Sequence, residues 1–225
     1  MTMGFRVLPR ARKVDAATIE QFKALPVANV SDCMARMSGG GATLRPLHKG
    51  GGLAGPALTV RTRPGDNLMV HKALKMIEPG DVIVVDAGGD LTNAIVGELM
   101  LSYAMKAGAA GMIINGAIRD SAWIAQNDFP VYAAGVTHRG PYRDGPGEIN
   151  LPVAFGGMVI QPGDLVLGDD DGLLCVPLDE TAGVYKAAKA KHDAEAKQYA
   201  DTMAGKLDAK EWVDQALKRL GCEGV

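Results

Sequence analysis

Short apolar runs, each ended by glycine or proline, dominate the chain up to residue 177. Runs rich in valine, isoleucine and leucine predict buried strands, because β-branched side chains pack well on a pleated surface. Good helix formers lie between these runs, most clearly at residues 98–107, where Gly108 can end a helix. The expected strands of this part are residues 53–63, 81–86, 111–115 and 131–134, and the expected helices are residues 18–25, 31–37, 71–76, 98–107 and 121–127.

The order of these elements predicts the topology of the sheet. Strands that alternate with helices imply parallel pairing with right-handed crossovers. The later strands are shorter and interrupted by glycine, which favours antiparallel or barrel-like packing. They are expected at residues 147–153, 158–160, 164–167 and 172–176. We therefore expect residues 1–177 to form one α/β domain, with a mixed, partly parallel sheet and a barrel-like β portion.

From residue 178 onward the composition becomes helical. Residues 186–203 and 209–220 are rich in helix formers and predict two helices separated by Gly205. Their apolar stripe is too thin to make a core of its own. It consists of Tyr185, Ala188, His192, Tyr199 and Met203. Residues 178–225 are therefore expected to form a helical extension that packs on a neighbouring subunit.

The charge and cysteine content exclude several classes of protein. With 24 basic and 26 acidic residues the net charge is -2, and no basic block offers the charge that nucleic-acid binding requires. No apolar run approaches the length of a membrane span. Residues 1–13 are basic but lack the apolar core of a secretory signal. Three widely spaced cysteines argue against a disulfide framework or a zinc cluster, so a cytoplasmic location is expected.

Three charged residues are expected to meet at one edge of the sheet. Glu98 opens the helix at residues 98–107, and Arg119-Asp120 follows the next strand, twenty residues further on. In a parallel strand-helix-strand unit, the start of a helix and the carboxyl end of the next strand lie at the same edge. Glu98, Arg119 and Asp120 can therefore face one pocket.

The residue types in this pocket suit an anionic, oxygen-rich ligand. Gly97 allows close approach, and free helix-start N–H groups of Glu98, Leu99 and Met100 would offer a carboxylate site. The planar guanidinium of Arg119 can bind a carboxylate or keto oxygen. Asp120 and Glu98 are hard oxygen ligands, and so small a set favours Mg²⁺ or Mn²⁺. The alternative is a loop ion pair and a favourable helix-start charge, each worth about 0.3 to 1 kcal/mol, and the pattern alone leaves both open.

Several segments resemble the RraA-like family, which includes class II pyruvate aldolases that act on 4-hydroxy-4-methyl-2-oxoglutarate and 4-carboxy-4-hydroxy-2-oxoadipate. The defining motif of that family, an acidic residue, twenty residues and then Arg-Asp, matches Glu98 and Arg119-Asp120. The resembling segments are residues 29–36 (NVSDCMAR), 55–60 (GPALTV), 65–74 (GDNLMVHKAL), 79–86 (PGDVIVVD), 97–100 (GELM), 108–121 (GAAGMIINGAIRDS) and 162–177 (PGDLVLGDDDGLLCVP).

This resemblance implies a carbon-carbon lyase with a swivelling β/β/α fold, assembled as a homotrimer or homohexamer. It implies that Asp120 binds the metal directly and that Arg119 contacts the pyruvate moiety. It further implies that residues 97–100 contact substrate and metal-bound waters. The leading acid of these aldolases is often Asp, so the longer Glu98 is a departure. An acid of the C-terminal extension, Glu195, is expected to reach the neighbouring subunit's metal through water.

Two further residues and a second function complete these expectations. Asn67 and His71 lie in a resembling segment and are expected to bind substrate, with His71 as a hydrogen-bond donor or a general acid; against this, a single histidine that opens a helix is more often structural. Arg139 and Arg143 either line the mouth of the site or are solvated. The resemblance implies retro-aldol cleavage of a 4-hydroxy-2-oxo acid to pyruvate, with possible oxaloacetate decarboxylation. The alternative is a non-catalytic regulator that binds ribonuclease E, and the extension beyond Pro177 favours the aldolase.

Overall fold

The computed structural model describes residues 3–36 and 39–225. The strands are β1 (Phe5–Val7), β2 (Arg45–Pro46), β3 (Leu53–Thr62), β4 (Val82–Asp86), β5 (Ala94–Val96), β6 (Gly111–Ile118), β7 (Val131–Val136), β8 (Gly147–Ile149), β9 (Val153–Phe155), β10 (Met158–Ile160), β11 (Leu165–Gly168) and β12 (Leu173–Val176). The helices are α1 (Ala16–Lys23), α2 (Val27–Asp32), α3 (Leu68–Leu74), α4 (Glu98–Lys106), α5 (Ser121–Ile124), the 3-10 turn η1 (Leu178–Glu180), α6 (Thr181–Met203) and α7 (Glu211–Arg219).

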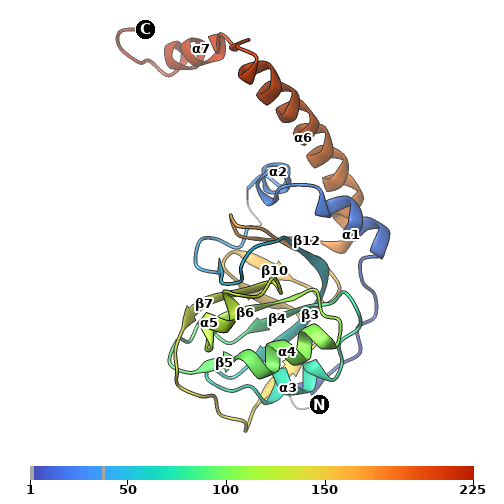
Figure 1. The fold of residues 1–225 in the computed structure, drawn as a ribbon. Coiled ribbons are helices and arrows are strands. Elements are labelled where there is room, and N and C mark those ends of the chain that lie inside the picture. The colour runs from blue at the N-terminus through green and yellow to red at the C-terminus, as the bar shows by residue number, and fades with distance from the viewer. Residues whose placement is uncertain (1–2, 37–38) are drawn as a thin grey trace. The chain divides into compact units, whose positions relative to one another are not determined.

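The main sheet is mixed, as the order of elements predicts. Its strand order is β1-β8-β3-β4-β6-β7-β2, and β3, β4, β6 and β7 run parallel (Figure 1). The strands β8 and β2 add antiparallel pairs, β5 pairs in parallel with β6, and β11 joins β3 to β12. The expected α/β class, with a mixed, partly parallel sheet and C-terminal helices, is confirmed.

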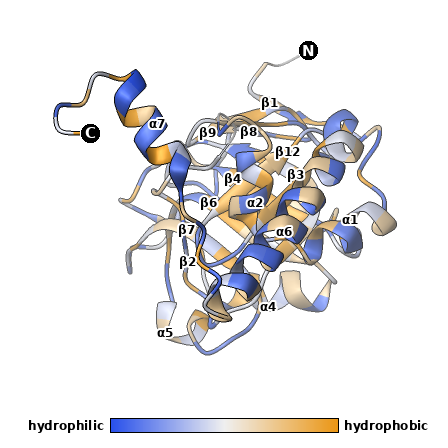
Figure 2. Ribbon diagram, turned by 90° about the horizontal axis from the view of Figure 1, so that it is seen from above, coloured by the Kyte–Doolittle hydropathy of each residue, from blue (hydrophilic) through white to orange (hydrophobic). Residues whose placement is uncertain are grey.

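Alternating side chains of the central strands enter two different cores. In β4, Ile83 and Val85 pack against α3 and α4 on one face, whereas Val82 and Val84 pack against the β9–β12 region on the other. Because both faces of β4 are covered, its sequence is a continuous apolar run. In Figure 2, which colours each residue by hydropathy, the hydrophobic residues gather on the central strands.

A third core lies beneath α1 and α2. Phe22 of α1 and Val30 of α2 pack there with β11 and β12. The beginning of α6 joins this core through Val184, Tyr185 and the fully buried Ala188. The chain divides into two compact units, Met1–Ala188 and Lys189–Val225. Among the described residues no helix is both long and apolar enough to cross a membrane.

The starts of α2 and α3 are among those that differ from the sequence-based expectation. The helix α2 begins at Val27 after Pro26, so Ser31 lies inside it and does not cap the helix expected at residues 31–37. A proline is favourable at a helix start because its φ is already fixed. Residue 37 lies outside the described residues. The helix α3 begins at Leu68, whose N–H donates to the Asp66 carboxylate at 2.9 Å, so His71 lies within the helix instead of opening it.

Candidate active site

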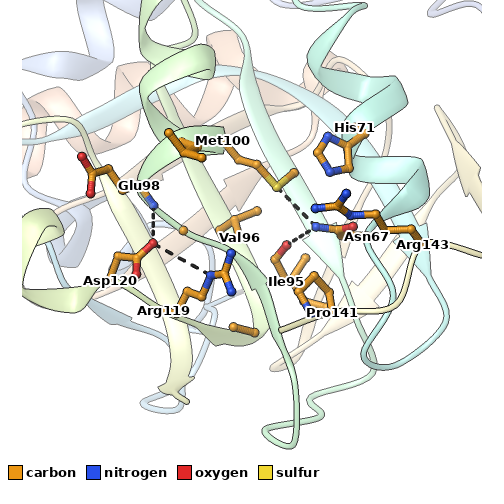
Figure 3. A pocket seen from close by; sticks show the side chains of 13 residues that line it. Asn67, His71, Ile95, Val96, Glu98, Met100, Arg119, Asp120, Pro141 and Arg143 are labelled. Atoms are coloured by element: carbon orange, nitrogen blue, oxygen red, sulfur yellow. Dashed lines mark hydrogen bonds and ion pairs between the residues drawn. The ribbon is translucent and has the colours of Figure 1, made fainter. Parts of the chain in front are cut away.

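One pocket, of about 340 Å³, collects the predicted site residues of the first unit (Figure 3). It lies where β5 and β6 end and α3 and α4 begin. Its lining residues are Asn67, His71, Ala94, Ile95, Val96, Gly97, Glu98, Leu99, Met100, Arg119, Asp120, Pro141 and Arg143. The remaining predicted residue, Glu195, lies in the second unit, where it pairs with Lys191 at 2.6 Å.

Parallel pairing of β5 and β6 brings Glu98 and Arg119 together. Val96 is paired with Ile118, and the Arg119 N–H donates to the Val96 carbonyl at 3.0 Å. The chain therefore leaves both strands at the same level, into α4 on one side and into Arg119-Asp120 on the other. The spacing in the sequence predicts that Glu98, Arg119 and Asp120 meet. It does not predict the short strand β5.

Asp120 adopts a left-handed backbone conformation, with φ 59° and ψ 35°. Few residues other than glycine adopt this region, although aspartate does so more readily than most. Its side chain does not cap α5; Oδ2 instead accepts the Glu98 N–H at 2.9 Å. The same oxygen lies 3.9 Å from Arg119 Nε, and about two fifths of each side chain is exposed to the pocket (44% and 41%). The turn thus aims one carboxylate at the start of α4.

Gly97 provides the space that Arg119 and Asp120 occupy. Its backbone is extended, at φ -153° and ψ -167°, so any residue could adopt its conformation. A Cβ atom there would lie 2.9 Å from Arg119 Cγ and too close to Asp120 Oδ2. The glycine is therefore required by the packing of the two functional side chains.

The helix-start N–H groups are not all free, contrary to expectation. The Glu98 N–H is bound to Asp120, and the Met100 N–H donates to the Gly97 carbonyl at 3.1 Å. Within the described part of the chain we find no hydrogen bond from the Leu99 N–H. An anion at the start of α4 would therefore be bound mainly by the Leu99 N–H and the Arg119 side chain, and not by three equivalent N–H groups.

The opposite wall carries polar groups that are buried and incompletely paired. Asn67 is 2% exposed; its Nδ2 donates to the Ile95 carbonyl at 2.9 Å and to Met100 Sδ at 3.3 Å. Its Oδ1 and His71 Nε2 are buried and find no hydrogen-bond partner among the described residues. A buried polar atom without a hydrogen-bond partner costs free energy of folding unless a ligand or a water molecule binds it.

Arg143 also lies on this wall, beside Asn67 and His71 in Figure 3. Burial, together with the positive charge of Arg143, lowers the pKa of His71 below its usual value. His71 is therefore neutral at neutral pH and can donate from one ring nitrogen and accept at the other. The sequence does not distinguish an Arg143 that lines the site from one that is solvated, because no local pattern predicts where its loop runs.

Asp120 and Glu98 are suited to hold a hard divalent cation. Among the described residues, no three His, Cys, Asp or Glu side chains gather as a metal-binding group. A cation here would therefore take Asp120 as a direct ligand, and Glu98, which lines the same pocket, could bind its waters. A small carboxylate set of this kind fits Mg²⁺ or Mn²⁺, which retain several waters.

The fold and the pocket together define the class of this protein: an α/β domain with an arginine and two acids at the carboxyl ends of adjacent parallel strands. The RraA-like family, described as Aldolase/RraA, matches residues 27–175. The chain belongs to this family.

Three known proteins are similar to this chain in sequence or in fold. A protein of Halalkalibacterium halodurans, named "Putative 4-hydroxy-4-methyl-2-oxoglutarate aldolase", is 40% identical over 183 residues, which cover 81% of this chain and 87% of the relative. An uncharacterized protein from Pseudomonas syringae shares the fold, with a TM-score of 0.79, 23% identity and coverage of 87% and 96% of the two chains. Streptomyces coelicolor RraAS2, described as an unusual member of the RNase ES inhibitor RraA family, has a TM-score of 0.75 and 26% identity over 82% and 96%.

Proposed function

We propose that this protein is a divalent-metal-dependent carbon-carbon lyase that cleaves a 4-hydroxy-2-oxo acid to pyruvate and a second carbonyl compound. The observation that carries the proposal is the single pocket in which Arg119, Asp120 and Glu98 meet. The name of the 40% identical relative supports the reaction class.

Arg119 would bind and stabilise the 2-oxo end of the substrate. Its guanidinium is half-exposed in the pocket, stays charged at any working pH and can donate to an oxygen in a planar arrangement. Asp120 would hold Mg²⁺ or Mn²⁺ directly and Glu98 would hold its waters, through oxygen ligands of the type these ions prefer. When bound, the ion supplies Lewis acidity, which lowers the pKa of water and withdraws charge from substrate oxygens.

The reaction is a retro-aldol cleavage. The C4 hydroxyl gives its proton to a water molecule and becomes the second carbonyl group as the C3–C4 bond breaks. The electron pair of that bond leaves a negative charge on the 2-oxo oxygen of pyruvate enolate. Protonation at C3 then gives pyruvate. Arg119 stabilises the charge that develops on that oxygen. Loss of carbon dioxide from oxaloacetate passes through the same enolate, so we propose this as a second activity.

We further propose that the protein assembles as a homotrimer or homohexamer, in which the C-terminal helices complete the site of a neighbouring copy. The second unit leaves large apolar side chains exposed within its own chain, including Tyr199 (69%), Met203 (70%) and Trp212 (65%). Burial against another copy would remove this apolar surface from water. Glu195 of the extension is the proposed acid that reaches the neighbouring metal through water.

Pyruvate release from a panel of 4-hydroxy-2-oxo acids tests the proposal directly. Exhaustive chelation should abolish turnover, and Mg²⁺ or Mn²⁺ should restore it. An Asp120→Asn variant should lose activity and bind the ion more weakly in calorimetry. Full activity in excess chelator would exclude the metal-dependent mechanism.

The second candidate function is regulation of ribonuclease E by binding. The observation in its favour is the fold shared with Streptomyces coelicolor RraAS2, whose description names an RNase ES inhibitor family. An RNA-cleavage assay with ribonuclease E, with and without this protein, separates the two functions. Inhibition without pyruvate release would support the regulator and exclude the lyase.

A further inference from the structure

A buried carboxylate beneath the candidate site joins two of its walls. Asp66 is 0% exposed and lines no pocket described above. Its Oδ2 accepts the N–H groups of Asp144 at 2.7 Å and Gly145 at 2.9 Å, and its Oδ1 accepts the Leu68 N–H at 2.9 Å. Arg63 Nη2 adds a longer contact of 3.2 Å to Oδ2. One carboxylate therefore holds the start of α3 and the loop before β8 together.

Both segments held by Asp66 carry pocket residues. The Tyr142 N–H donates to the Gly65 carbonyl at 2.8 Å, and the Asn67 N–H donates to the Tyr142 carbonyl at 3.0 Å. Arg143 thus lies between two anchored neighbours, Tyr142 and Asp144. On the other segment, Asn67 precedes α3 and His71 lies within it.

The chemistry of a carboxylate is needed at this position. An ionised carboxylate only accepts hydrogen bonds, and each oxygen of Asp66 faces backbone donors. The isosteric asparagine would turn an NH₂ group toward Leu68 or toward Asp144 and Gly145. In a buried site this leaves N–H groups unsatisfied, so one of the two segments must move.

We propose that Asp66 is a positioning residue for substrate: its carboxylate sets the Arg143 wall of the pocket against the wall formed by Asn67 and His71. Arg143 is a positive charge placed apart from Arg119, and its position depends on a loop that Asp66 anchors. This inference rests on the proposed lyase function, since substrate affinity is its readout. Asp66 touches no reacting atom, so its loss weakens binding more than the chemical step.

The first test separates positioning from general stability. Asp66→Asn should raise the KM for 4-hydroxy-4-methyl-2-oxoglutarate about tenfold, the equivalent of one charge-assisted hydrogen bond, and should leave kcat within about threefold. The matched control is Asp164→Asn. Asp164 is 4% exposed and also accepts two backbone N–H groups, from Gln161 and Leu178, but lines a different pocket. It should lose comparable stability and keep the wild-type KM.

The second test asks whether Asp66 acts through Arg143. Arg143→Met removes the charge and leaves Asp66 in place, and should itself raise KM. If Asp66 works by positioning Arg143, the double variant should be no worse than Arg143→Met alone. Multiplicative KM effects, or a fall in kcat at constant KM in Asp66→Asn, would overturn the proposal.

A third measurement does not depend on activity. Hydrogen exchange should be faster in Asp66→Asn on at least one side of the anchor, either at the Leu68 amide or at the Asp144 and Gly145 amides, and unchanged at all three in Asp164→Asn. If the wild-type protein releases no pyruvate, the proposed function fails, while faster exchange in Asp66→Asn still supports the anchor. Unchanged exchange in Asp66→Asn overturns the inference whatever the activity.

Discussion

Asp120 and Gly97 show how single residues make this site possible. Asp120 is held in a left-handed turn, and its carboxylate occupies the space that a side chain on Gly97 would fill. The sequence predicts both residues as parts of a site. From the sequence we expect Gly97 to allow a ligand to approach the backbone closely. In the structure, the side chains of Arg119 and Asp120 pack against Gly97 instead. The spacing predicts that these segments meet at one edge of the sheet, but it does not show which side chains pack against the glycine.

Gly97→Ala should therefore strongly reduce activity with little loss of stability. The extended backbone accepts alanine, but the new Cβ displaces the Asp120 carboxylate and the Arg119 stem. We expect kcat/KM to fall by about 10²-fold or more, comparable to the loss of one preorganised electrostatic contact. The control is Gly183→Ala in α6, where a Cβ meets open space and activity should not change. Wild-type turnover in Gly97→Ala would show that the position of Asp120 is unimportant.

Arg119→Lys tests whether the arginine acts on the developing enolate. Lysine keeps the charge and loses the planar pair of donors, so kcat should fall by about 10²-fold, as on removal of an oxyanion donor. An effect confined to KM would instead indicate binding of the ground state alone. Oxaloacetate decarboxylation, measured in parallel, should fall by a similar factor because both reactions share the enolate. Loss of only one of the two reactions would contradict this role.

At the scale of elements, the sequence predicts long periodic segments better than short ones. The helix at residues 98–107 and the buried strands β3, β4, β6 and β7 are recovered to within a few residues. The sequence does not predict β5, because its three residues carry no periodicity, although this strand determines where Gly97 lies. The start of α3 was placed late because its anchor, Asp66, accepts hydrogen bonds from segments about eighty residues apart in sequence.

The wall formed by α3 and the loop before β8 predicts a specific titration. Burial, and secondarily Arg143, lower the pKa of His71. Nuclear magnetic resonance titration should place it below the usual value of about 6.5. Arg143→Met should raise the pKa, although not fully, because burial is the larger cause. An unchanged His71 pKa in Arg143→Met would show that the two side chains do not interact.

The lowered pKa of His71 also determines whether stability rises or falls with pH. The pKa of His71 is lower in the folded protein than in the unfolded chain, so the unfolded chain binds the proton more tightly. The contribution of His71 to the free energy of unfolding is therefore fully present above about pH 6.5 and is lost as pH falls through the folded-state pKa. His71→Gln should remove this part of the pH dependence, which thermal unfolding at several pH values would show.

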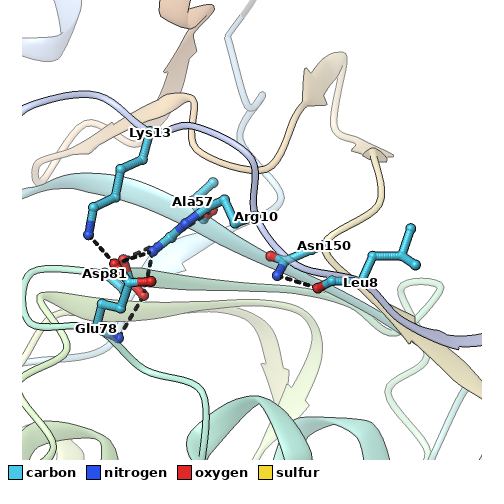
Figure 4. Close-up of polar contacts among 7 residues, drawn as sticks. All are labelled: Leu8, Arg10, Lys13, Ala57, Glu78, Asp81 and Asn150. Carbon is cyan, nitrogen blue, oxygen red and sulfur yellow. Dashed lines mark hydrogen bonds and ion pairs between the residues drawn. The ribbon is translucent and has the colours of Figure 1, made fainter.

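The N-terminal segment is fastened to the sheet by a buried ion pair (Figure 4). Arg10 Nη1 lies 2.8 Å from Asp81 Oδ1, and the two side chains are 6% and 0% exposed. Nearby, Asn150 Nδ2 donates to the Leu8 carbonyl at 2.9 Å. These contacts hold residues that precede α1 against the edge where β3 and β4 begin.

Arg10→Met should destabilise the protein by about 3 to 5 kcal/mol, because it leaves the Asp81 charge buried without its partner. The control is Arg12→Met. Arg12 pairs with Asp179 in solvent, with both side chains more than 60% exposed, and its loss should cost far less stability because solvent screens the pair. Denaturant unfolding monitored by circular dichroism would measure both. Equal costs for the two variants would show that burial does not decide the strength of the Arg10–Asp81 pair.

At the scale of the whole molecule, the two units differ in what their sequences reveal. The first unit buries three apolar cores, so its periodicity predicts the fold class. Most side chains of the second unit are exposed within the chain, and a thin stripe does not say what covers it. The thin stripe nevertheless predicts packing on a neighbouring subunit, and the resemblance to aldolases adds the expectation of a homotrimer or homohexamer.

Truncation of the chain tests the role proposed for the second unit. The core contacts of α6 determine at which residue the shortened chain should end. A cut after Pro177 would remove Val184, Tyr185 and Ala188 from the core beneath α1, and the domain would lose stability for reasons unrelated to function. A chain ending at Ala188 keeps these contacts and should fold. If the helices beyond it complete a neighbouring site, that chain should be largely inactive and should sediment as smaller assemblies.

Glu195→Gln in the full chain should keep the assembly and lose activity, which separates the role of the acid from the packing of the helices. Normal turnover by the truncated protein would show that each chain carries a complete site of its own.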